Sequence, residues 1–225
     1  MNQILAFLYH IGVHDIFGLI SLIGLGIFLF RRFILKKAPV LSSRAVSREL
    51  LQKCVEILDK KEKSGCGVYE VPEEIARALS VNIKDEEYLK KLLCNICEHL
   101  GMDGNFIRLL LDDTPVPERA GQIRTDLAFT TIRLEVKPYY GLDIVTAVLA
   151  HEAMHLHLYY EGIYLKDTWE NEILTDTAAV YCGFGEYIYR GYAVMRGEFA
   201  FSYQKVGYIK QEDVRYIQEL MCHGG

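Results

Sequence analysis

The sequence lacks the charge pattern of a nucleic-acid-binding protein. Its 25 lysines and arginines are outnumbered by 30 aspartates and glutamates, giving a formal net charge of -5. The basic residues form no dense stripe that could follow a phosphate backbone. No internal repeat or low-complexity tract is present. Nucleic acid is therefore not an expected partner.

Cysteines are few and scattered. Six are present, an even number that would suggest a disulfide framework in a short secreted chain. Several fall in helical patterns, which favours a reducing compartment in which thiols pack as small hydrophobes. Cys94 and Cys97 form a C-x-x-C, but no second C-x-x-C or histidine pair follows at zinc-finger spacing. A structural or redox role for this pair stays open as an alternative.

Charge is absent from Ile16 to Phe30, and basic residues follow at Arg31–Lys37. A secretory signal has its positive charge before the apolar run and a cleavage site after it, which is the reverse of this order. Residues 1–37 are therefore predicted to form a membrane anchor with one transmembrane helix, an amphipathic or buried helix being the alternative. Because positive charges gather on the cytoplasmic side, we expect a single-pass protein of the cell membrane whose main domain is cytoplasmic.

The remainder of the 225 residues is long enough for one domain, and a hydrophobic fraction of 51% can fill its core. Residues 38–43 read as a linker and residues 44–225 as the domain. Its first half is predicted to be mostly helical, before a small sheet. Helices are predicted at Arg44–Lys61, Val71–Leu79, Asp85–Leu100 and within Gly207–Met221, and strands at Phe106–Leu111 and Ala128–Lys137.

A metal-binding pattern lies in the predicted helix Asp143–Glu161. His151 and His155 are four residues apart in an H-E-x-x-H sequence, so they share one helix face and can direct ring nitrogens at one ion. By helical geometry Glu152 lies about 60° beyond His155 round the helix, where it can reach water at that ion without being a ligand. The pattern predicts a Zn²⁺ site with Glu152 as general base.

Two histidines supply half of a tetrahedral shell, so a third protein ligand is expected on a neighbouring element. Asp167, followed three residues later by Glu170, is typical of a helix start. In this next helix Glu172 and Asp176 share a face, which we expect to continue with the small residues Ala179 and Gly183 and so allow close approach. Glu172 is the predicted third ligand, and Asp176 the group that accepts the other ring N–H of a ligating histidine.

Together these motifs resemble the gluzincin metallopeptidases, the thermolysin-like clan in which H-E-x-x-H is followed by N-E-x-x-x-D. Asn171, Glu172 and Asp176 match the second motif. The resemblance covers about Thr131–Gly185 and implies a minimal zincin-like α+β domain with a small sheet and two active-site helices. It also implies zinc on His151, His155 and Glu172, with Asp176 orienting His151. In this comparison Thr131–Val136 would be an edge strand that pairs with an extended substrate.

Other metal sites fit the sequence less well. Metzincins need a third histidine six residues after the second, where this chain has Glu161. A di-iron carboxylate bundle needs two E-x-x-H pairs, and only that of Glu152 and His155 is present. His157 lies on a different face of the helix from His151, about 120° round the helix wheel, so we interpret it as a packed or surface histidine.

The sequence thus predicts a membrane-anchored zinc peptidase that hydrolyses peptide bonds of protein or peptide substrates with water activated by the metal. Two alternatives remain open. One is a non-catalytic interaction or scaffold protein whose metal only ties two helices together. The other is a metal hydrolase of non-peptide amides or esters.

Overall fold

The computed structural model describes residues 45–61, 67–112, 121–125, 130–192 and 207–223. The chain divides into two compact units, Met1–Ala45 and Val46–Gly225, and the elements below belong to the second. The predicted membrane anchor, residues 1–37, and the linker, residues 38–43, lie outside the described residues. Within the described ranges, no helix is both long and apolar enough to cross a membrane.

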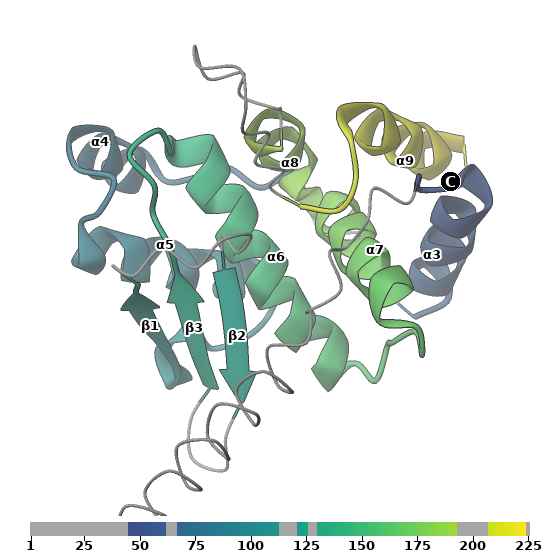
Figure 1. Cartoon of the computed structure of the whole chain (residues 1–225), viewed down its shortest axis with the longest axis horizontal. Helices are drawn as coiled ribbons and strands as arrows, with labels where there is room; N and C mark the ends of the chain where they lie inside the picture. Colours follow the sequence, from purple (N-terminus) through teal and green to yellow (C-terminus); the bar gives the residue numbers. More distant parts are fainter. Residues whose placement is uncertain (1–44, 62–66, 113–120, 126–129, 193–206, 224–225) are drawn as a thin grey trace, which may run out of the picture. The chain divides into compact units, whose positions relative to one another are not determined.

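The described part of the second unit is mostly helical with a small sheet, in agreement with the predicted α+β class (Figure 1). The strands are β1 (Ile107–Leu111), β2 (Gly121–Thr125) and β3 (Thr130–Leu134), and a short 3₁₀ turn, η1 (Gly104–Phe106), precedes β1. The helices are α3 (Arg48–Lys61), α4 (Glu73–Val81), α5 (Glu86–His99), α6 (Leu142–Tyr160), α7 (Thr168–Ala179), α8 (Gly185–Gly191) and α9 (Gln211–His223), with a π-helical turn, η2 (Val180–Phe184), between α7 and α8.

Helix starts follow the local capping signals. The Asp85 carboxylate accepts a hydrogen bond from the Tyr88 backbone N–H and caps α5, and Asp167 does the same for α7 through the N–H of Glu170. Pro72 stands at the N-cap position of α4, where its missing N–H costs nothing. These caps explain why α4, α5 and α7 begin close to the starts that the sequence predicts.

The sheet has the strand order β1-β3-β2, with β1 parallel and β2 antiparallel to β3. Ile132 in the central strand pairs with Leu109 of β1 on one side and with Ile123 of β2 on the other. The prediction that the strand beginning at Thr131 is an edge strand is therefore wrong, because β3 is hydrogen-bonded along both sides. The outer strand that packs against α6 is β2, which the sequence did not predict.

Helix α6 passes through the centre of the unit and is buried on most sides. It packs against α5, α7, α8 and the strands β2 and β3, and Figure 1 shows it between the sheet with α4 and α5 on one side and α7, α8, α9 and α3 on the other. Apolar residues lie around most of the circumference of α6 rather than along one stripe, as is expected of a helix that is buried on most sides. A rigid, enclosed helix holds the side chains that it carries in fixed positions.

The prediction that Gly183 continues the face of Glu172 is wrong, because α7 ends at Ala179. Gly183 lies in η2 with φ +93°, a left-handed conformation that strains residues with a Cβ. Its carbonyl accepts a hydrogen bond from Tyr69 N–H at 3.1 Å, and a Cβ here would lie 2.1 Å from the Gly67 carbonyl oxygen. A glycine at position 183 therefore allows the close backbone contact with residues 67–69.

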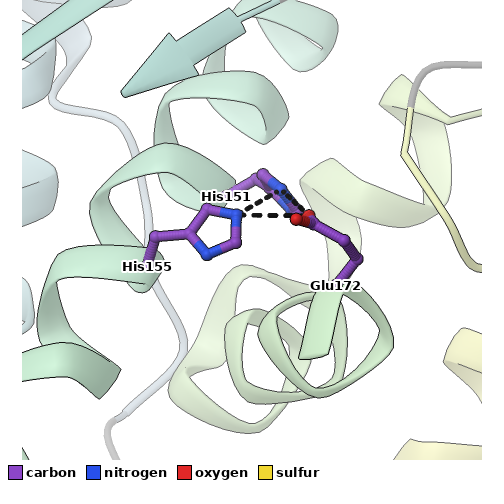
Figure 2. A group of neighbouring side chains, drawn as sticks. All are labelled: His151, His155 and Glu172. Carbon is purple, nitrogen blue, oxygen red and sulfur yellow. Dashed lines mark hydrogen bonds and ion pairs between the residues drawn. The ribbon is translucent and has the colours of Figure 1, made fainter. Parts of the chain in front are cut away.

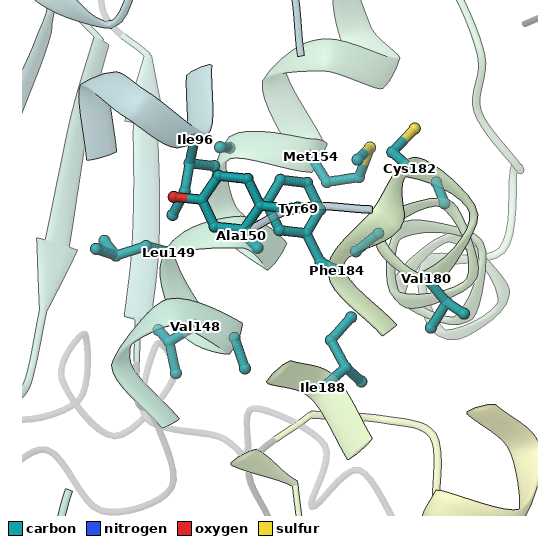
Figure 3. Packing of buried hydrophobic residues seen from close by; sticks show 14 of the residues in the cluster. Tyr69, Ile96, Val148, Leu149, Ala150, Met154, Val180, Cys182, Phe184 and Ile188 are labelled. Carbon is teal, nitrogen blue, oxygen red and sulfur yellow. The ribbon is translucent and has the colours of Figure 1, made fainter. Parts of the chain in front are cut away.

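Next to this turn, aromatic and sulfur-containing side chains fill the core between α5, α6 and η2 (Figure 3). Phe184 is fully buried, and its ring centroid lies 4.6 Å from that of Tyr69. Met154 of α6 and Cys182 of η2 are buried in the same cluster. Burial of a side chain such as Phe184 contributes about 1.5–3 kcal/mol, so this cluster fixes the end of α7 against α6.

Candidate metal centre

The site is built on two neighbouring helices, α6 and α7, which pack against each other. His151 and His155 lie on successive turns of α6, and their ring centroids are 4.7 Å apart. Glu172 lies in the second turn of α7 and reaches across to both imidazoles (Figure 2). The structure thus brings together the three residues that the sequence predicted as metal ligands.

Three possible ligand atoms form a nearly equilateral triangle. His151 Nε2 lies 3.1 Å from His155 Nε2, and Glu172 Oε2 lies 3.2 Å from each of these nitrogens. The three residues form a group that could hold a metal ion. Their side chains remain 10%, 20% and 18% exposed for His151, His155 and Glu172, so solvent reaches the group.

The triangle has the size that a tetrahedral zinc shell requires. Zinc–ligand distances of about 2.0–2.1 Å place the ligand atoms of a regular tetrahedron about 3.3–3.4 Å apart, within a few tenths of an ångström of the distances here. Two imidazole nitrogens and one carboxylate oxygen are also donors that suit zinc. The donor set and its spacing therefore fit the ion.

Asp176 binds His151 on the side of the ring that faces away from the triangle. Its Oδ1 lies 2.7 Å from His151 Nδ1, the ring nitrogen that faces away from the triangle. Since the carboxylate can only accept, the proton lies on Nδ1 and Nε2 is directed at Glu172. Asp176 lies on the turn of α7 that follows Glu172, as predicted, and it is fully buried.

The Asp176 carboxylate also receives three hydrogen bonds from a later part of the chain. The Tyr192 hydroxyl donates to Oδ1 at 2.7 Å, and the backbone N–H groups of Tyr208 and Ile209 donate to Oδ2 at 2.7 and 3.2 Å. The Tyr208 ring also stacks on His151, with centroids 5.8 Å apart and planes inclined by 21°. Four donors therefore fix the carboxylate that orients His151.

A different group holds His155. Its Nδ1 lies 3.2 Å from the hydroxyl oxygen of Thr175, and that hydroxyl donates to the Asn171 carbonyl at 2.9 Å. Thr175 is fully buried. The Asn171 side chain has another role, because its Oδ1 accepts a hydrogen bond from Leu165 N–H and so secures the loop before α7.

Charge in the site changes two pKa values. Burial opposes the charged form of His151, but the charge of Asp176 and the hydrogen bond to it outweigh burial and raise the His151 pKa well above 6.5. Burial alone would raise the pKa of Glu172, but hydrogen bonds from His151 and His155 lower it from 4.5 to about 2. The metal-free site thus pairs an imidazolium with a carboxylate, and an incoming cation replaces the proton.

Glu152 is buried on α6 beside the first histidine, with 6% of its surface exposed. It is not a member of the three-residue group. Its negative charge contributes to the raised pKa values of His151 and Tyr192. This position agrees with a residue beside the metal site that is not itself a ligand.

The other sequence candidates lie apart from the triangle. His157 is buried and does not belong to the group, as expected for a packed histidine. Burial raises the pKa of the Cys97 thiol to about 12, and the Cys94 sulfur lies 3.9 Å from Asn105 Oδ1. The described cysteines are free thiols in this structure.

Sequence reasoning missed Thr175 and Tyr192. Nothing distinguishes Thr175 from other helical threonines that bond to the carbonyl four residues earlier. Tyr192 is one of 15 tyrosines, and only the fold places it beside Asp176.

No family model, curated protein or solved structure matches this chain.

Proposed function

We propose that this protein is a zinc-dependent peptidase, with His151, His155 and Glu172 as the zinc ligands and Glu152 as the general base. The observation that carries the proposal is the triangle of two imidazole nitrogens and one carboxylate oxygen, all within 3.2 Å of one another. The same His₂Glu donor set occurs in catalytic zinc sites of peptidases. The zincin-like form of the fold is part of this proposal.

The number of ligands supports catalysis over a purely structural metal. Structural zinc sites have four protein ligands, whereas catalytic sites have three and keep one position for water or substrate. Among the residues that the structure describes, the group has three members. Partial exposure of His155 and Glu172 leaves a route by which substrate can arrive. A scaffold whose metal only joins α6 and α7 needs neither property.

Zinc supplies Lewis acidity, which acidifies water and polarises a substrate carbonyl. Glu152 accepts a proton from the attacking water and returns it to the leaving amine. Asp176 keeps the imidazole of His151 in position by binding the ring nitrogen that faces away from the triangle. Each residue thus has a separate part in binding, orientation or proton transfer.

The proposed substrate is an extended segment of a protein or peptide. Strand β2 is an outer strand of the sheet, and it packs against the helix that carries both histidines. Among the strands that the structure describes, β2 is hydrogen-bonded to β3 alone, and an extended peptide can pair with the other side of β2 through backbone hydrogen bonds. We assign substrate pairing to β2 because β3, the strand that the sequence suggested for it, is paired on both sides.

We also propose that residues 1–37 anchor the protein in the cell membrane, with the catalytic unit on the cytoplasmic side. A reporter fused after Gly225 tests this orientation. A reporter that functions only in the cytoplasm should be active in this fusion. Activity of a reporter that functions only outside the cytoplasm would contradict the proposed orientation.

Hydrolysis by the purified full chain tests the proposed function. We expect cleavage of an unfolded protein substrate to stop when a chelator removes the metal, and to return when about one equivalent of Zn²⁺ is restored. Chelation should leave the helical content largely unchanged, because α6 and α7 are held by an apolar core. Zinc binding without cleavage of any substrate in a broad peptide library would favour the non-catalytic alternative.

A further inference from the structure

Thr175 is in an unusual position for a helical threonine, because its hydroxyl lies between a backbone carbonyl and a ligand imidazole. The oxygen is 2.9 Å from the Asn171 carbonyl oxygen and 3.2 Å from His155 Nδ1. The side chain is fully buried, so water cannot compete for these contacts. A hydroxyl has one proton, and only one of its two neighbours can receive it.

The carbonyl decides where that proton goes. The Asn171 oxygen can only accept, so it takes the hydroxyl proton, and the free lone pairs of Thr175 are left to accept from His155 Nδ1–H. The reverse arrangement would place lone pairs of two oxygens against each other at 2.9 Å. This arrangement puts a proton on His155 Nδ1, and a metal that binds Nε2 displaces only the proton that Nε2 donates to Glu172 Oε2, 3.2 Å away.

From this geometry, and on the basis of the zinc site proposed above, we propose that Thr175 is a positioning residue that sets the tautomer of His155. It is the counterpart of Asp176, which acts on His151. The two differ in charge, since a neutral hydroxyl orients His155 and a carboxylate orients His151. Without the hydroxyl, neutral His155 is free to carry its proton on Nε2, and a metal must then displace it.

The chain offers a matched control in Thr177, two residues later on α7. Thr177 is also fully buried, and its hydroxyl donates to the Ile173 carbonyl at 2.7 Å, the same helical hydrogen bond that Thr175 makes with Asn171. In that bond the Thr177 hydroxyl contacts a backbone carbonyl and not a histidine of the proposed zinc site. Thr177→Val therefore reproduces the loss of a buried hydroxyl and its helix bond while leaving His155 in place.

The test compares Thr175→Val, Thr175→Ser and Thr177→Val in the full chain, with Zn²⁺ affinity measured by competition with a chromophoric chelator. We expect Thr175→Val to weaken zinc binding by about 10–100-fold, the usual loss when a group that orients a ligand is removed. Thr175→Ser keeps the hydroxyl and should bind zinc as wild type does, as should Thr177→Val. Equal affinities of Thr175→Val and Thr177→Val would overturn the role of Thr175.

A second measurement separates this role from the zinc site itself. In metal-free protein labelled with ¹⁵N at histidine, ring nitrogen shifts report the tautomer of His155, assigned by its loss in His155→Gln. Wild type and Thr177→Val should show a protonated Nδ1, and Thr175→Val should show loss of that proton, with Nε2 protonated instead. If wild type binds no zinc, the proposed function fails, whereas an unchanged tautomer in Thr175→Val overturns the role of Thr175.

Discussion

His151 donates through Nδ1 to the carboxylate of Asp176 at 2.7 Å, and this hydrogen bond links the two helices of the site. The same carboxylate receives the Tyr192 hydroxyl and two backbone N–H groups of residues 208 and 209. The orientation of a predicted zinc ligand therefore depends on where the C-terminal part of the chain docks.

Asp176→Asn should weaken zinc binding by about 10–100-fold, because the amide removes the charge that supports Nδ1–H of His151. Asparagine keeps the shape and one acceptor oxygen. Asp176→Ala is less informative, because it strands four buried donors at about 1–3 kcal/mol each and so also destabilises the domain. Chelator competition measures affinity, and denaturant unfolding of the metal-free protein is the control. Unchanged affinity in Asp176→Asn would show that this carboxylate does not tune the site.

Zinc affinity should rise with pH through the neutral range. In the metal-free protein the His151 pKa is well above 6.5, so the ring is protonated near pH 7 and zinc must displace that proton. One displaced proton makes the affinity rise by about tenfold per pH unit below the raised pKa. Calorimetry in two buffers with different ionisation enthalpies counts the protons released. No proton release near neutral pH would contradict the prediction.

The same two groups make the stability of the metal-free protein depend on pH. The raised pKa of His151 means that its stabilising charge is fully present below 6.5 and is lost as pH rises through the raised value. The lowered pKa of Glu172 acts in the opposite range, with its contribution present above 4.5 and lost as pH falls towards about 2. Thermal unfolding of the metal-free chain across pH should show both losses, and His151→Gln should abolish the one at high pH.

Gly207→Ala should destabilise the docking of the C-terminal segment. Gly207 has φ +79°, and a Cβ there would lie 1.8 Å from the ring of Tyr192, which the bond to Asp176 holds in place. Gly162 is a matched control, with φ +66° and no neighbouring atom within 4 Å of the place that a Cβ would take. We expect about 1 kcal/mol lost in Gly162→Ala from backbone strain, and about 1–3 kcal/mol more in Gly207→Ala from the clash. Equal losses in urea unfolding would contradict the close contact.

The parts of the site that the sequence predicted are those set by local helical geometry. His151 and His155 share a face because they are four residues apart, and Glu172 and Asp176 share one for the same reason. The donors that complete the site come from further along the chain. Tyr192 and the N–H of Tyr208 lie 16 and 32 residues after Asp176, and their positions follow from tertiary packing that no local pattern encodes.

The fold was predictable to a similar extent. Apolar spacing and capping residues such as Asp85 and Asp167 marked the helices. Strand β2 was missed because Gly121–Thr125 has a single large apolar residue, Ile123, and no alternating pattern. Gly183 was misread because glycine fits both a helix and a left-handed turn, and the choice depends on its contact with residues 67–69.

Glu152→Gln tests the central claim most directly, because it removes the proposed general base while leaving the three zinc ligands in place. Glutamine has nearly the shape of glutamate, so the buried position on α6 remains filled, but it cannot accept the proton of the attacking water. The variant should keep about one equivalent of zinc and the wild-type unfolding transition, and should lose about 10²–10⁴-fold in the rate of hydrolysis of an unfolded protein substrate. Hydrolysis by Glu152→Gln at the wild-type rate would show that peptidase chemistry does not take place at this site.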